Sequence, residues 1–301
     1  MNIPHSGFRN PHSATPLFRE MAVVGAGLIG GSLALAARKA GLVETVAGVD
    51  ADPAHRKVAL AMGMVDRVAG ELTADVARAD LVVLAVPVAE IVALLPEVAR
   101  RVTDDCLVTD VGSVKGLILA AGDAAFPDGR FVAGHPIAGQ ERSGPAAARP
   151  DLFEGANWIG TPSALTNANA VQRVAALWRG VGSTIVTMEA GWHDEVFAAV
   201  SHLPHLVAYA LMDAVLGLPL GEERLQFAAG GLRDFTRVAA SHPLMWRDIF
   251  LMNRGPILRA LTAYREVLAA LEGAIRDGDG EALTARLARA RMAREEIPHR
   301  P

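Results

Sequence analysis

Residues 22–32, AVVGAGLIGGS, decide the fold class. A β-rich run reaches Val24 and a helical pattern continues to Lys39, so the Gly-x-Gly-x-x-Gly pattern between them has a strand-turn-helix context. In that context the first glycine permits a tight turn, the second lets the backbone approach a pyrophosphate, and the third lets the helix pack on the strand. The first helical turn offers unpaired N–H groups to phosphates. The sequence therefore predicts a dinucleotide site at Gly25, Gly27, Leu28, Ile29 and Gly30.

The acidic residue that such a site needs is Asp50, at the end of the next β-rich run. It follows Gly30 by about 20 residues, the spacing at which a carboxylate accepts hydrogen bonds from the adenosine ribose hydroxyls. A carboxylate there repels a 2′-phosphate, so NAD is the expected cofactor. His55 and Arg56 open the following helix and could reach a phosphate, which leaves NADP open. The alternative is that the glycines only close a turn and Asp50 only caps a helix.

Short β-rich runs alternate with helical patterns up to Met188, which predicts a Rossmann-type, doubly wound, mainly parallel α/β sheet. The expected strands are residues 22–25, 45–50, 81–86, 106–111, 131–134, 157–161 and 184–188. After Gly191 the β-branched runs disappear, and an all-helical domain is expected. The predicted organisation is a flexible leader at 1–20, a dinucleotide-binding domain at 21–189 and a helical substrate and dimerisation domain at 190–301.

Composition excludes several classes of function. The chain has 301 residues and a net charge of −4, so it lacks the basic excess of a nucleic-acid-binding protein. A single cysteine, Cys106, cannot form an internal disulfide, which fits a cytoplasmic protein. The most apolar stretch, from Leu81, is interrupted by Pro87 and Glu90, and no membrane span is expected. In the last two helical stretches apolar residues recur every three or four positions, which favours a homodimer.

Three polar or rigid segments follow expected strands and should meet at the carboxyl edge of the sheet, where ligands bind in such folds. They are Val86-Pro87, residues 110–115 (DVGSVK) and His135-Pro136. Singly, each has a structural alternative: Pro87 ends a strand, Asp110 caps a helix, Lys115 is a solvated charge and the histidine is a turn residue. Their convergence at one edge instead favours a functional site.

At these residues the chain resembles the prephenate dehydrogenase family. The resemblance covers nearly everything after the leader, in the segments GAGLIGGS at Gly25, VTDVGSVK at Val108, GHPIAGQERSG at Gly134, SHLPH at Ser201 and GGLRDFTRVAASHPLMWRDIFLMN at Gly230. It implies a stand-alone dehydrogenase that oxidatively decarboxylates prephenate, or its amino counterpart arogenate, during tyrosine synthesis. It also implies a Rossmann domain followed by a helical dimerisation domain.

The resemblance assigns roles to individual residues. His135 matches the catalytic histidine that accepts a hydrogen bond from the ring hydroxyl, and Ser113 matches a serine beside that histidine and the nicotinamide. On the residues alone, Ser113 is equally a helix N-cap. Arg237 matches a substrate-binding arginine whose alternative is a salt bridge with Asp234 or Asp248. The further expected substrate contacts are His205, His202 and Glu141, and the cofactor site gains Val86, Pro87 and Ser113.

Three rival interpretations remain. A β-hydroxyacid dehydrogenase commonly uses a lysine in its helical domain, but Lys115 is the last lysine of this chain. A non-catalytic nicotinamide sensor could lose His135 or Arg237, and both are present. His202 and His205 lie on one helical face and could bind zinc with His193 or Asp194, but hydride transfer to nicotinamide needs no metal, so none is predicted. Trp246 and Asn253 are expected to be packing residues.

Overall fold

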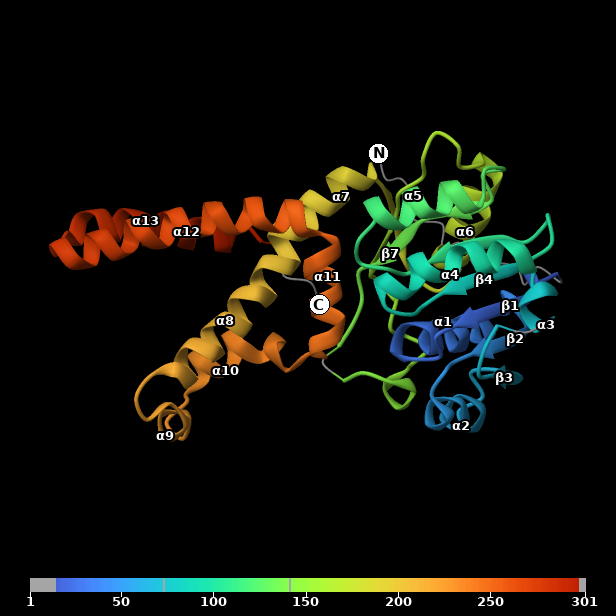
Figure 1. Ribbon diagram of the computed structural model, residues 1–301, viewed down its shortest axis with the longest axis horizontal. Coiled ribbons are helices and arrows are strands. Elements are labelled where there is room, and N and C mark those ends of the chain that lie inside the picture. The colour runs from blue at the N-terminus through green and yellow to red at the C-terminus, as the bar shows by residue number, and fades with distance from the viewer. Residues whose placement is uncertain (1–14, 73, 141, 298–301) are drawn as a thin grey trace, which may run out of the picture.

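The computed structural model describes residues 15–72, 74–140 and 142–297, which form two halves lying side by side (Figure 1). The α/β half reaches Thr187, and only helices follow from Ala190. The first strand begins at Phe18, which is almost fully buried, so residues 18–20 belong to the sheet and not to the predicted leader. The sequence pattern missed this start because Arg19 and Glu20 interrupt the apolar run.

A six-stranded parallel sheet forms the centre of the α/β half, with strand order β3-β2-β1-β4-β5-β6. Its strands are β1 (Phe18–Val24), β2 (Val43–Val49), β3 (Arg67–Ala69), β4 (Leu81–Leu84), β5 (Leu107–Asp110) and β6 (Phe131–Val132). The central strands are apolar because helices cover both faces of the sheet. β3 was not predicted, since its three half-buried residues carry little pattern. The strand order reverses between β1 and β4, where a ligand cleft is expected.

Two apolar cores lie on opposite faces of this sheet. One joins α1 and α6 to the sheet, and the other joins α4 and α5 to it. The helices of this half are α1 (Leu28–Lys39), α2 (Pro53–Ala61), α3 (Ala74–Ala77), α4 (Val88–Arg101), α5 (Gly116–Ala125) and α6 (Ala168–Gly180), with a 3-10 turn at η1 (Pro145–Ala147). Because α1 and α5 begin at the carboxyl ends of β1 and β5, their N-termini lie at the same edge of the sheet.

The last three strands of the α/β half form a separate sheet, which the prediction of one sheet did not anticipate. β7 (Gly134–Pro136) pairs antiparallel with β8 (Asn157–Gly160), and β8 pairs parallel with β9 (Thr184–Thr187). The expected strand at 131–134 is therefore divided between β6 and β7. His135 is paired with Ile159 in this small sheet, so its backbone position is fixed by strand pairing.

The helical half begins with one continuous helical run from Ala190 to Gly217. It comprises α7 (Ala190–Phe197), a π-helical segment η2 (Ala198–His202) and α8 (Leu203–Gly217). After it come α9 (Gly221–Leu225), α10 (Gly230–Thr236), the 3-10 turn η3 (Arg237–Ala240), α11 (Pro243–Met252), α12 (Arg254–Asp277) and α13 (Gly280–Glu295). Trp246 and Ile249 of α11 pack into the core beside α4 and join the two halves. The α12–α13 pair projects away from the α/β half (Figure 1).

The run from Ala190 to Gly217 is long and apolar enough, by length and composition alone, to cross a membrane, and the prediction of no span did not consider it. Yet its first turns carry His193 and Asp194, which are buried in polar contacts with the α/β half. The helix that follows, α8, has only Ala208 fully buried. Its apolar side chains border a groove of about 540 Å³ that Leu211, Phe235 and Leu261 help to line.

Candidate active site

The glycine turn after β1 fits a dinucleotide. Gly25 has φ +97°, and a Cβ there would overlap the carbonyl oxygen of Ala85. A Cβ on Gly30 would overlap the carbonyl of Gly25, so both glycines are required by the protein's own packing. Gly27 is different, because a Cβ there would meet no protein atom within 4 Å. It precedes the first residues of α1, Leu28 and Ile29, and no side chain caps that helix. The open space over Gly27 is where a pyrophosphate would approach.

Asp50 lies at the carboxyl end of β2 beside this turn. Its Oδ2 accepts a hydrogen bond from the Ala26 N–H at 3.0 Å, and its Oδ1 accepts one from the Asp52 N–H at 2.9 Å. The Arg56 guanidinium donates to the carbonyl of Asp50 at 2.7 Å, and His55 Nδ1 lies 3.4 Å from the carboxylate. Both residues that could have favoured NADP are thus engaged around Asp50.

Two further predicted cofactor residues, Val86 and Pro87, follow the end of β4 beside the glycine turn. A methyl of Val86 lies close to the space beside Gly25, and Pro87 is the N-cap residue of α4. Ala85 N–H donates to the carbonyl of Val24 at 2.7 Å, which joins the ends of the two strands. Pro87 follows the end of β4 and precedes α4, so its alternative role in ending the strand is compatible with a position beside the cofactor turn.

His135 lies beyond the same edge, on β7. Its Nδ1 is 2.9 Å from Nε2 of His193, and its ring makes an edge-on contact with Phe197, with centroids 5.0 Å apart. Burial is the largest cause that holds the pKa of His135 well below its usual range, and the neighbouring His193 and the Lys115 charge act in the same direction. The imidazole is consequently neutral near pH 7.

A buried ion pair holds the first residue of β7 through its backbone. The Lys115 ammonium is fully buried, pairs with the Asp110 carboxylate and donates to the carbonyl of Gly134 at 2.8 Å. The other Asp110 oxygen accepts the Gly134 N–H at 3.1 Å. Lys115 is thus not a solvated charge and Asp110 does not cap a helix, contrary to their sequence alternatives. Because Gly134 directly precedes His135, this pair holds the histidine in place.

Ser113 lies in the loop between Asp110 and Lys115 and is partly exposed at the carboxyl edge. Its alternative role as the N-cap of the next helix is wrong. The N-terminus of α5 is instead capped by Asp194, whose two carboxylate oxygens accept the N–H groups of Lys115 at 2.7 Å and Gly116 at 2.8 Å. This contact from α7 docks the helical half onto the sheet edge.

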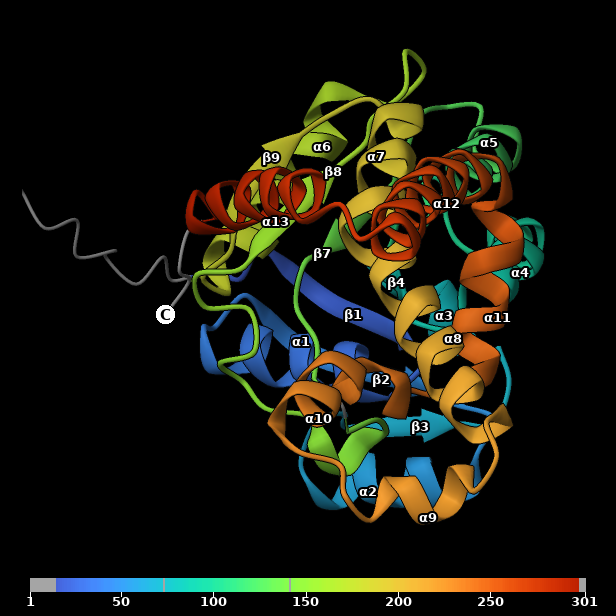
Figure 2. The same ribbon diagram turned by 90° about the vertical axis from the view of Figure 1, so that its left-hand side faces the viewer.

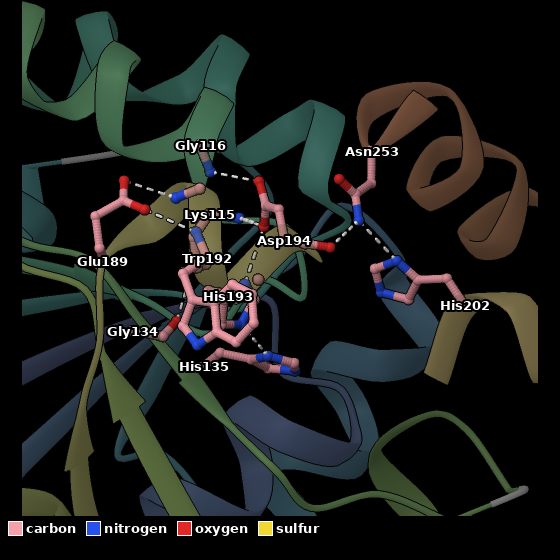
Figure 3. A network of polar contacts seen from close by, with 12 residues as sticks. Lys115, Gly116, Gly134, His135, Glu189, Trp192, His193, Asp194, His202 and Asn253 are labelled. Atoms are coloured by element: carbon pink, nitrogen blue, oxygen red, sulfur yellow. Dashed lines mark hydrogen bonds and ion pairs between the residues drawn. The ribbon is translucent and has the colours of Figure 1, made fainter. Parts of the chain in front are cut away.

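Figure 3 shows that Asp194 is the centre of a longer polar network. Its Oδ1 is 2.9 Å from Nδ1 of His193, and its backbone carbonyl accepts a hydrogen bond from Asn253 at 2.9 Å. The same Asn253 amide lies 3.0 Å from Nδ1 of His202. Burial lowers the pKa of His202 to about 4, so this ring is also neutral near pH 7. The network runs from His135 to His202.

The other substrate candidates lie on the helices next to His202. His205 stacks on Trp246 with centroids 3.7 Å apart and donates from Nδ1 to the carbonyl of Ser201 at 2.8 Å, while His202 contacts the same indole edge-on. Arg237, exposed at the start of η3, is close enough that its charge lowers the pKa of His205, after burial as the main cause. Asp248 pairs with Arg247. Glu141, also predicted, lies outside the described residues.

Viewed from the helical half (Figure 2), α7, α8 and α11 lie in front of the sheet. His135 and Ser113 lie at the carboxyl edge of the sheet. His202 and His205 lie on η2 and α8, and His202 is linked to that edge through Asn253 and Asp194. The sequence interpretation missed His193, Asp194 and Asn253 in this network, having treated them as possible metal ligands or packing residues. The adjacent His193 and Asp194 were the available signal of a polar site, but no nearby residue indicated which side chains they would contact. Among the described residues no group of three potential metal ligands occurs.

Comparisons with known proteins agree with this geometry. The family model for the prephenate dehydrogenase nucleotide-binding domain matches residues 33–187, and that for the prephenate dehydrogenase dimerisation domain matches residues 189–289. The chain is 36% identical over 284 residues to a prephenate dehydrogenase of Bacillus subtilis, covering 92% of this chain and 76% of that protein. It is 36% identical over 280 residues to a cyclohexadienyl dehydrogenase of Zymomonas mobilis, covering 92% and 96%.

A solved structure is similar over almost the whole fold. Prephenate dehydrogenase from A. aeolicus, in complex with hydroxyphenyl propionate and NAD+, superposes with a TM-score of 0.87 at 34% identity, covering 93% of this chain and 98% of that one. With both family models matched in order, the chain belongs to the prephenate dehydrogenase family.

Proposed function

We propose that this protein is an NAD-dependent prephenate dehydrogenase of tyrosine synthesis, converting prephenate to 4-hydroxyphenylpyruvate and carbon dioxide. The observation that carries the proposal is the position of His135. Its neutral imidazole lies beyond the carboxyl edge of the sheet and contacts His193 of α7, the first helix of the helical half. The homologous enzyme with NAD+ bound supports the same cofactor here.

The residues divide the reaction between them. NAD, when bound, supplies the hydride acceptor. As hydride leaves the ring carbinol carbon, positive charge develops there, and the neutral His135 relieves it by accepting the hydroxyl proton. By the resemblance, the Ser113 hydroxyl is proposed to hydrogen-bond near His135 and the nicotinamide. Loss of the ring carboxylate as carbon dioxide makes the ring aromatic, so the step is effectively irreversible.

Substrate binding falls to the helical half. A planar guanidinium binds a carboxylate through two parallel hydrogen bonds, and Arg237 is proposed to hold one carboxylate of the substrate. His205 and His202 contact the substrate from α8 and η2. The resemblance adds Glu141 as an expected substrate contact. Arogenate is the alternative substrate, because it differs from prephenate only in carrying an amino group in place of the side-chain keto group. The carboxylate of Asp50 favours NAD over NADP.

The partner of this chain is proposed to be a second copy of itself. The family assigns residues 189–289 to a dimerisation domain, and the apolar face of α8 and α12 is left open in a single chain. A partner subunit that covers this face would bury the run from Ala190 to Gly217, so the helix needs no membrane to be stable. The cytoplasm remains the expected compartment, and no nucleic-acid partner is expected.

The test follows absorbance at 340 nm after mixing the protein with NAD and prephenate or arogenate, and then with NADP. We expect NADH formation with prephenate; no signal with either substrate would reject the assignment. His135→Asn should lower kcat far more than it raises KM, because the proton acceptor is lost in the chemical step. The matched control is His242→Asn, an exposed histidine at the start of α11. An equal loss in kcat and affinity would reject His135 as the base.

A further inference from the structure

We propose that His193 and Asp194 form a proton relay behind His135, presenting its unprotonated Nε2 to the substrate and receiving the proton's charge after transfer. The proposal rests on the proposed role of His135 as the base. His193 and Asp194 are positioning residues in this arrangement, since they act through His135 and not on the substrate. They would contribute to the chemical step and leave cofactor binding unchanged.

The contacts determine which ring nitrogens carry protons. An ionised carboxylate can only accept, so the 2.9 Å contact between Asp194 Oδ1 and His193 Nδ1 places a proton on that Nδ1. In a neutral imidazole the other nitrogen, His193 Nε2, is then an acceptor. It lies 2.9 Å from His135 Nδ1, which must therefore be the donor. The remaining nitrogen, His135 Nε2, is left unprotonated and able to accept the substrate proton.

Asp194 is well suited to orient the two rings. Its carboxylate accepts two N–H groups at the start of α5, where the helix dipole favours negative charge, and these bonds together with His193 lower the pKa of Asp194 despite its burial. Asn253 holds the backbone carbonyl of the same residue at 2.9 Å. The carboxylate is therefore ionised and fixed in position.

The donor and acceptor in the contact between Asn253 and His202 can also be assigned. Asn253 Nδ2 faces the Asp194 carbonyl, which can only accept, so this atom is the amide nitrogen and it also donates to His202 Nδ1. His202 is therefore neutral and does not compete for the Asp194 carboxylate. The charged and titratable groups around the two relay histidines are Asp194 on α7, Lys115 before α5, Asp110 on β5 and His202 on η2.

The groups around the two rings favour a positive charge on His193 over one on His135. Burial is the main cause that lowers the pKa of both His135 and His193, so both rings are neutral at rest. When the substrate hydroxyl proton arrives at His135 Nε2, the Nδ1 proton can pass along its hydrogen bond to His193 Nε2. His135 is then neutral again, and the imidazolium charge lies on His193 in direct contact with the Asp194 carboxylate. The Lys115 charge opposes a proton on either ring, whereas the hydrogen bond from Asp194 favours the proton on His193. One proton moves in at Nε2 and one moves out at Nδ1.

The experiment compares Asp194→Asn, His193→Gln and His193→Asn with wild type. A glutamine amide oxygen can occupy the region of Nε2 and still accept from His135, whereas an asparagine side chain is too short to do so. We expect kcat to fall roughly 10²-fold or more in Asp194→Asn and His193→Asn, with KM for NAD within about twofold, because a wrong histidine tautomer disables the base. His193→Gln should keep at least about tenfold higher kcat than His193→Asn. The matched control is Glu195→Gln, a neighbouring carboxylate paired with Arg259 at the surface.

The pH profile separates a relay from a merely structural role. The Asp194 carboxylate raises the pKa of His193, so removing its charge should move the acid limb of kcat/KM to lower pH, while a loosened fold would leave that limb in place. An unmoved limb in Asp194→Asn overturns the relay, and equal kcat in the two His193 variants overturns the orientation of His135 by an acceptor at this position. If Asp194→Asn fails to fold, His193→Gln decides the matter: a glutamine amide cannot take up the proton, so a kcat equal to wild type in His193→Gln overturns the relay.

A readout without substrate keeps this proposal distinct from the proposed function. Ring ¹⁵N NMR of the free protein at pH 7.5, assigned by the signals lost in His135→Gln, should show His135 protonated at Nδ1. A proton on Nε2 overturns the relay even if prephenate is oxidised. If the Nδ1 form is present and neither prephenate nor arogenate is oxidised, the proposed function fails and the tautomer assignment stands.

Discussion

Gly25 and Gly27 offer a matched pair of substitutions whose effects should differ in kind. At Gly25 an alanine would adopt φ +97° and its Cβ would overlap the Ala85 carbonyl oxygen. The left-handed backbone costs roughly 1–2 kcal/mol and the overpacking about 1–3 kcal/mol, so Gly25→Ala should reduce stability by about 2–5 kcal/mol. At roughly 2–4 °C per kcal/mol, the melting temperature should fall by about 4–20 °C.

Gly27→Ala should leave the fold intact and damage cofactor binding. Gly27 has φ −79°, which alanine adopts freely, and its Cβ would meet no protein atom within 4 Å, so stability should change by less than about 0.5 kcal/mol. The added methyl would occupy the approach to the pyrophosphate and should raise the Kd for NAD at least tenfold, or about 1.4 kcal/mol.

Thermal unfolding and titration of NAD by protein fluorescence measure both variants. Unchanged NAD affinity in Gly27→Ala would refute the pyrophosphate path, and a melting temperature of Gly25→Ala within about 2 °C of wild type would refute the packing argument.

Three further perturbations test the site and its supports. Arg237→Ala should raise KM for prephenate roughly 10- to 100-fold with little change in kcat, because one charged hydrogen-bond partner of a carboxylate is lost; an unchanged KM in steady-state kinetics moves the carboxylate site elsewhere. Lys115→Met should destabilise the protein by about 3–5 kcal/mol in urea unfolding, because it leaves the buried Asp110 carboxylate uncompensated, and a loss under about 1 kcal/mol would contradict that account. The His202 pKa of about 4 predicts acid sensitivity: the unfolded chain binds a proton near pH 6.5 and the folded one does not, so stability is complete above about pH 6.5 and is lost as pH falls toward 4. Urea unfolding should show His202 contributing roughly 2 kcal/mol of loss between pH 7.5 and 5, and His202→Gln should flatten that dependence; a slope equal to wild type would refute the assignment.

The parts of the fold that were predicted correctly have strong local patterns. The glycine turn, the apolar strands β1, β2, β4 and β5, and the change to helices at Ala190 all follow from residue spacing and composition. The parts that were missed have weak local patterns. β3 is short and half-buried, Arg19 and Glu20 hide the start of β1, and nothing in residues 131–136 shows that the chain leaves one sheet and enters another at Ala133.

The residues of the candidate site likewise differ in how far the sequence alone could identify them. The position of His135 after a strand could be inferred from the sequence, and the role given to it, to Ser113, to His205 and to Arg237 came from family resemblance. The structure then placed His135, His202 and His205 in one continuous set of contacts. It also showed that α5 is capped by a carboxylate from the other half of the molecule and not by Ser113, the alternative that the sequence left open.

The sequence by itself determined the dinucleotide-binding half, because a turn, a helix N-terminus and an acid at the end of the next strand are features of neighbouring residues. Only the tertiary structure decided what surrounds the base. His135 meets His193 across 58 positions of sequence, and Lys115 meets Asp194 across 79. Such pairings depend on how α7 docks against the carboxyl edge of the sheet. Burial keeps the imidazoles neutral, and the hydrogen bonds from His193 and from the start of α5 keep the Asp194 carboxylate ionised beside them despite its burial.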